Sequence, residues 1–77
     1  MRTELAEALG RAVENLAALI ADDEEVIAPI RGLRVVREQE AFGDRYIWRV
    51  SAILDNVVEY KYAIYIDEDT LHSETDA

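Results

Sequence analysis

The sequence of 77 residues lacks cysteine and contains one histidine, one proline and three glycines. Without cysteine the chain forms neither a disulfide nor a thiolate metal site, so a reducing compartment, the cytoplasm, is expected. The only histidine, His72, has no recognisable triad with Ser51, Thr70 or Ser73, and the scattered glycines form no phosphate-binding loop. These absences argue against an enzyme and against a bound cofactor.

Long hydrophobic runs are also missing. No segment approaches the roughly 20 apolar residues of a membrane span, and the charged start of the sequence is unlike a signal peptide. With 51% hydrophobic and 32% charged residues, the chain is too apolar to be disordered. We expect a soluble protein with a single domain over residues 1–69 and a polar acidic tail over residues 70–77.

Residues 4–21 have the periodicity of an amphipathic helix. Thr3 is a suitable N-cap, and Asp22 with Glu25 resembles a capping box for a short helical turn that ends before Pro29. Glu4 and Glu7 complement the positive end of the helix dipole. The apolar stripe of the helix contains Leu5, Leu9, Val13, Leu16, Leu19 and Ile20.

After Gly32 the pattern becomes that of strands. Residues 46–54 and 57–66 alternate between two faces, with hairpin turns at Gly43-Asp44 and Asp55-Asn56. A strand at about residues 33–41 completes a three-stranded antiparallel β-meander. The face toward the helix is expected to carry Tyr46, Trp48, Val50, Ala52, Leu54, Val58, Tyr60, Tyr62, Ile64 and Ile66. The sequence therefore predicts an α+β fold, a two-layer sandwich of one long helix, a short helical turn and the meander.

The other face of the predicted sheet mixes charged and apolar residues. Its expected apolar members are Leu33, Val35, Ile47, Ile53 and Tyr65, which together with an open strand edge offer a route to self-association. The aromatic residues Trp48, Tyr60 and Tyr62 could stack on nucleic-acid bases, but acidic neighbours nearly cancel the central arginines. Core packing against the helix is the better interpretation of these aromatic side chains.

Acidic residues outnumber basic ones by seventeen to eight, and the net charge is −9. Residues 1–30 and residues 63–77 each carry −5, whereas residues 31–62 carry +1. This charge repels nucleic acid and anionic membranes and attracts cationic protein surfaces. The candidate partner-binding residues are Glu4, Glu7, Glu14, Asp22, Asp23, Glu24, Glu25, Asp67, Glu68 and Asp69.

The dense acidic clusters, residues 22–25 and 67–69, lack the spacing of a calcium-binding loop. No metal site is therefore expected, and the clusters can also serve as helix starts or as solvated surface. Glu4, Glu7 and Glu14 span about 15 Å of helix axis and imitate a row of phosphates only coarsely. Arg11 interrupts this row and is expected to pair with Glu7.

The short, cysteine-free chain, with Asp22-Asp23-Glu24-Glu25 and Asp67-Glu68-Asp69 beside a small α+β core, resembles small phage-encoded inhibitors, including anti-CRISPR proteins. It is similar in the same way to the acidic immunity proteins of nucleases. The resemblance is one of composition, covers the whole chain and includes no diagnostic motif. It implies a non-enzymatic inhibitor that binds a cationic nucleic-acid-handling protein, a CRISPR effector or a nuclease, with carboxylates in place of phosphates.

A second hypothesis belongs to a different class of protein. The chain could be a small structural or accessory protein that self-associates through its outer sheet face. Monomer and homodimer are both open at this point. An enzyme is a distant third, because no group of residues supports one.

Overall fold

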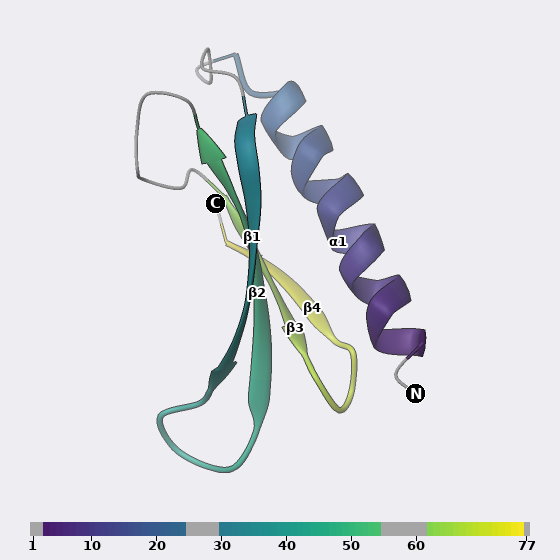
Figure 1. The fold of residues 1–77 in the computed structure, drawn as a ribbon, viewed down its shortest axis with the longest axis vertical. Helices are drawn as coiled ribbons and strands as arrows, with labels where there is room; N and C mark the ends of the chain where they lie inside the picture. The colour runs from purple at the N-terminus through teal and green to yellow at the C-terminus, as the bar shows by residue number, and fades with distance from the viewer. Residues whose placement is uncertain (1–2, 25–29, 55–61, 77) are drawn as a thin grey trace.

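The computed structural model describes residues 3–24, 30–54 and 62–76. Its elements are α1 (Thr3–Ala21), β1 (Ile30–Gln39), β2 (Tyr46–Leu54), β3 (Ala63–Asp67) and β4 (Ser73–Asp76). The strands form one antiparallel sheet in the order β1-β2-β3-β4. The helix α1 lies along one face of this sheet (Figure 1). The predicted α+β class is confirmed, although the sheet has four strands and not three.

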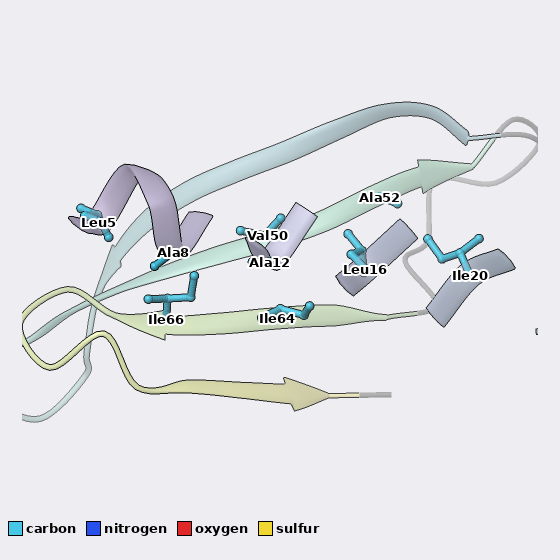
Figure 2. Close-up of a cluster of buried hydrophobic side chains, with 9 residues drawn as sticks. All are labelled: Leu5, Ala8, Ala12, Leu16, Ile20, Val50, Ala52, Ile64 and Ile66. Atoms are coloured by element: carbon cyan, nitrogen blue, oxygen red, sulfur yellow. The ribbon is translucent and has the colours of Figure 1, made fainter. Parts of the chain in front are cut away.

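The core lies between α1 and the central strands β2 and β3. Leu16 is fully buried, and two of the other buried helix positions are the alanines Ala8 and Ala12. Because alanine is small, the helix backbone can lie close to the sheet at the point where the side chains of Val50 and Ile64 point toward the helix (Figure 2). The buried apolar cluster consists of Leu5, Ala8, Ala12, Leu16, Ile20, Val50, Ala52, Ile64 and Ile66.

The expected core face of β2 and β3 is confirmed. Val50, Ala52, Leu54, Ile64 and Ile66 are buried, as their even-numbered positions predict. Trp48 and Tyr62 are partly buried and pack against the same cluster. Val58, Tyr60 and the turn at Asp55-Asn56 lie outside the described residues.

The ends of two elements also follow the sequence. The helix ends at Ala21, and Asp22 N donates a hydrogen bond to Ala18 O over 3.0 Å. Gly43, in the predicted turn between β1 and β2, has a φ of 118°, which favours glycine. The expected short helical turn is not helical over Asp22 to Glu24, and its remainder lies outside the described residues.

A fourth strand, β4, occupies part of the segment expected to be a tail. Its residues Ser73, Glu74, Thr75 and Asp76 are all exposed, so no apolar alternation marks them as a strand. Backbone pairing with β3 fixes the strand, and Leu71 packs against the core just before it. Leu71 has a φ of 63°, in the left-handed region, which helps the chain to reverse direction. The prediction of three strands is therefore wrong at the C-terminal end of the sheet.

The facing of β1 also differs from the expectation. Leu33 lies opposite Ala52 and Val35 lies opposite Val50, so both side chains share the face that carries the helix. Assigning Leu33 and Val35 to the outer face was wrong. They remain 48% and 45% exposed because α1 packs over β2 and β3 and leaves β1 uncovered.

Candidate protein-binding surface

The acidic clusters lie at opposite ends of the molecule. The N-terminal end of α1, with Glu4 and Glu7, is near the turn between β3 and β4, whereas Asp22 to Glu24 follow the other end of the helix (Figure 1). This separation follows from the meander, in which β3 runs parallel to β1 and antiparallel to the helix. Glu25 lies outside the described residues. The nine described candidate carboxylates therefore do not form one patch.

Asp67 is part of the framework of the turn between β3 and β4. Its side chain is 4% exposed, and its Oδ2 atom forms an ion pair with Arg45. The Oδ1 atom accepts hydrogen bonds from the backbone N–H groups of Asp69 and Thr70, over 2.8 and 3.0 Å. The Asp67 carboxylate therefore connects the turn between β3 and β4 to Arg45 in the loop before β2. It is too deeply buried to contact a partner protein.

Glu68 is also engaged within the chain. Its Oε1 and Oε2 atoms accept hydrogen bonds from Arg37 Nε and Nη2 over 2.7 and 3.0 Å, and its side chain is 7% exposed. Trp48 Nε1 donates to the same Oε1 over 3.0 Å. The hydrogen bond with Glu68 is the main reason that the pKa of Arg37 is raised above its ordinary value. The Arg37 guanidinium also lies 3.6 Å from the centre of the Tyr46 ring.

The remaining candidate residues are mainly on the surface. Asp23 is partly buried and accepts a hydrogen bond from the Tyr62 hydroxyl. The described contacts contain no ion pair between Glu7 and Arg11, so the expected pair is not formed. The exposed members of the predicted set are Glu4, Glu7, Glu14, Asp22, Glu24 and Asp69.

The outer sheet face contains a hollow that the candidate set did not include. Ile47 and Tyr65 line two adjoining depressions, of about 210 and 260 Å³, that share these residues and Glu40. Glu38 lies opposite Ile47, and Glu74 lies opposite Tyr65. The lining residues are Glu38, Gln39, Glu40, Ala41, Arg45, Ile47, Tyr65, Asp67, His72 and Glu74. We call this region the outer hollow.

The outer hollow combines apolar surface with carboxylates. Glu38 Oε1 is 3.1 Å from Arg49 Nη2, and Glu74 Oε1 is 3.5 Å from His72 Nε2. Ile47 and Tyr65 can cover the alkyl stem of a lysine or arginine side chain while the carboxylates bind its charged end. The sequence placed Ile47 and Tyr65 on this face, but only strand register shows which acids stand beside them.

Neither a metal centre nor a membrane span emerges from the described parts of the chain. Within residues 3–24, 30–54 and 62–76, no three His, Asp or Glu side chains are arranged to hold a metal ion. The described helix is not both long enough and apolar enough to cross a bilayer.

No protein-family model, curated protein or solved structure matches the sequence or its fold.

Proposed function

We propose that this chain is a non-enzymatic inhibitor that binds the cationic nucleic-acid-binding surface of another protein, such as a CRISPR effector or a nuclease. One observation carries the proposal, namely the uneven distribution of exposed charge over the fold. Arg11 is the one exposed basic residue that the structure describes on three elements, namely α1, the turn that follows β3, and strand β4. The exposed acids of the same elements are Glu4, Glu7, Glu14, Asp69, Glu74 and Asp76.

Most of the exposed basic residues lie elsewhere. Arg31, Arg34 and Arg37 are on β1, and Arg45 precedes β2. The elements farther from β1 therefore present an acidic surface that can pair with the lysines and arginines of a partner. Those basic residues would otherwise bind phosphates, so inhibitor and nucleic acid should compete. Charge complementarity of this kind speeds association and makes it sensitive to salt.

The rigid helix supports this mechanism by fixing the spacing of its carboxylates. Glu7 and Glu14 are two helical turns apart, or about 10 Å along the axis. Both side chains are exposed on a helix whose opposite side is buried, so little ordering is needed when a partner binds. The outer hollow is a separate contact point on the face of the sheet opposite α1, where Tyr65 and Glu40 could receive one arginine or lysine side chain.

The test is to isolate a partner and to measure competition with nucleic acid. The chain would be used as bait in a bacterial lysate, and captured proteins would be purified and assayed for binding at increasing salt. We expect a captured nucleic-acid-binding protein that is released by its own DNA or RNA and whose affinity falls steeply with salt. A partner whose binding is indifferent to both nucleic acid and salt would contradict the proposal.

Matched variants locate the binding surface. The triple change Glu4→Gln, Glu7→Gln and Glu14→Gln removes three exposed carboxylates from α1. The control Asp22→Asn, Glu24→Gln and Asp44→Asn removes three exposed carboxylates elsewhere and leaves the same net charge. A larger loss of affinity in the α1 variant is expected. Because Asp22 and Glu24 also belong to the candidate set, equal losses would mean that net charge or the cluster after α1, and not a surface on α1 alone, attracts the partner.

A further inference from the structure

Strand β1 is an edge strand of the described sheet. It pairs with β2 on one side, and no described strand pairs with it on the other. An unpaired edge presents backbone N–H and C=O groups that can pair with another strand. Proteins commonly protect such an edge with a short strand, a proline, inward-pointing charge or a covering element. β1 has a register shift between Ile30 and Gly32, and Arg37 places a charge on the helix-bearing face, but from Gly32 to Gln39 the strand pairs regularly with β2 and no described element covers its outer edge.

Apolar surface accompanies this edge. Ile30, Leu33 and Val35 are 42%, 48% and 45% exposed, and their strand partners Leu54, Ala52 and Val50 are buried. The face of β1 therefore continues the core beyond the helix, because among the described residues α1 contacts β2 and β3 but not β1. A partner that extends the sheet would shield part of this apolar surface while it pairs the backbone.

The charges of β1 identify the partner. We propose that β1 pairs antiparallel with β1 of a second copy of the chain, about a two-fold axis at Val36. In this register Arg34 lies opposite Glu38 of the partner subunit, and the symmetry forms this pair twice. Val36 lies opposite Val36 of the partner subunit, and Val35 is diagonal to Val35 of the partner subunit. The result is a continuous eight-stranded sheet with both helices on one face.

Registers with the axis nearer the N-terminal end of β1 are less complementary. Moving the axis by one residue to Val35 places Arg34 opposite Val36 of the partner subunit. Moving it to Arg34 places the two Arg34 side chains opposite each other, which is unfavourable. Glu38 already lies 3.1 Å from Arg49 in its own chain, so the dimer would extend this contact into a network across the two subunits.

A charge-swap experiment tests both the dimer and its register. Light scattering on the unmodified protein should give twice the 8.8 kDa mass of one chain. Arg34→Glu alone places glutamates opposite each other twice, and Glu38→Arg alone places arginines opposite each other twice. Each variant should weaken the dimer by at least about tenfold. Mixing the two variants restores both opposite-charge pairs, so heterodimers should form, and native mass spectrometry can identify them.

Control variants distinguish this interface from others. Glu74→Arg reverses a charge on β4, the other edge of the sheet, and should leave the dimer intact. Circular dichroism must show that every variant is folded. The proposal is overturned if the unmodified protein has the mass of one chain at all concentrations, or if the mixture stays monomeric. It is also overturned if Glu74→Arg dissociates the dimer, or if the mass grows beyond two chains, because β1 would then be pairing with β4 or with another surface.

Discussion

Trp48 Nε1 donates a hydrogen bond to Glu68 Oε1, which lies 3.0 Å away on the turn that follows β3. Trp48 is partly buried at the edge of the core. Its indole N–H finds a hydrogen-bond acceptor in the carboxylate of Glu68, which belongs to the turn after β3. Arg37 completes the arrangement from β1. Three parts of the sheet therefore meet at one acidic side chain, and this contact has measurable consequences for stability.

Glu68→Gln should lower the free energy of unfolding, because it removes the charge that pairs with Arg37, although solvent weakens this pair since the Arg37 side chain is 42% exposed. The glutamine oxygen can still accept the hydrogen bond from Trp48. Urea denaturation provides the measurement. Asp69→Asn is the control, since its exposed side chain should change stability by less than about 0.5 kcal/mol. Equal effects of the two changes would show that Glu68 has no special role in the fold.

Asp67→Ala should destabilise the protein more than Asp67→Asn. Alanine removes the partner of Arg45 and both acceptor contacts of the turn, and loss of one member of a buried ion pair typically costs about 3–5 kcal/mol. Because Arg45 is mostly exposed, we expect a value at or below the lower end of that range. Asparagine keeps an oxygen for the turn. Melting temperatures of the two variants in the same buffer would establish the order.

Ala12→Leu should destabilise the fold by about 1–3 kcal/mol, because Ala12 is 3% exposed where α1 lies against the sheet. A larger side chain there must push the helix away from the strands. Ala17→Leu makes the same change on the exposed side of the helix and should be nearly neutral. Thermal unfolding followed by circular dichroism compares the two. A neutral Ala12→Leu would mean that the helix packs less closely than the structure shows.

Glu40→Lys should reduce binding of an oligoarginine peptide to the outer hollow. The change replaces an attractive charge beside Ile47 and Tyr65 with a repulsive one. Asp44→Lys makes the same change of net charge at an exposed position outside the hollow and should have the smaller effect. Fluorescence anisotropy at low salt gives both affinities. The outer hollow has no specific role if the two variants lose affinity equally.

Local patterns predicted the central part of the fold. The helix ends at Ala21, and the second strand covers Tyr46 to Leu54, as the sequence indicates. Both elements bury an apolar face, so the periodicity of their apolar residues reports their structure directly. The alternating facing of β2 and β3 was predicted for the same reason.

Contacts between distant residues account for the failures. β4 has no apolar face because α1 does not cover it, and its order comes from backbone pairing with β3. Leu33 and Val35 could have faced either way until the register with β2 placed them opposite Ala52 and Val50. Among the candidate site residues, Asp67 and Glu68 are held by arginines 22 and 31 residues earlier in the chain, which no local pattern can show.

The placement of the arginines on β1 gives the molecule an electric dipole as well as a net charge. The −9 charge determines how strongly a cationic partner attracts the chain from a distance. In the electric field of a cationic partner, this dipole produces a torque on the chain. The torque turns β1 away from the partner and turns α1 and β4 toward it before contact. The orientation of the first encounter is thus set by the fold, because the sheet keeps its basic strand at one edge and its acidic strand at the other.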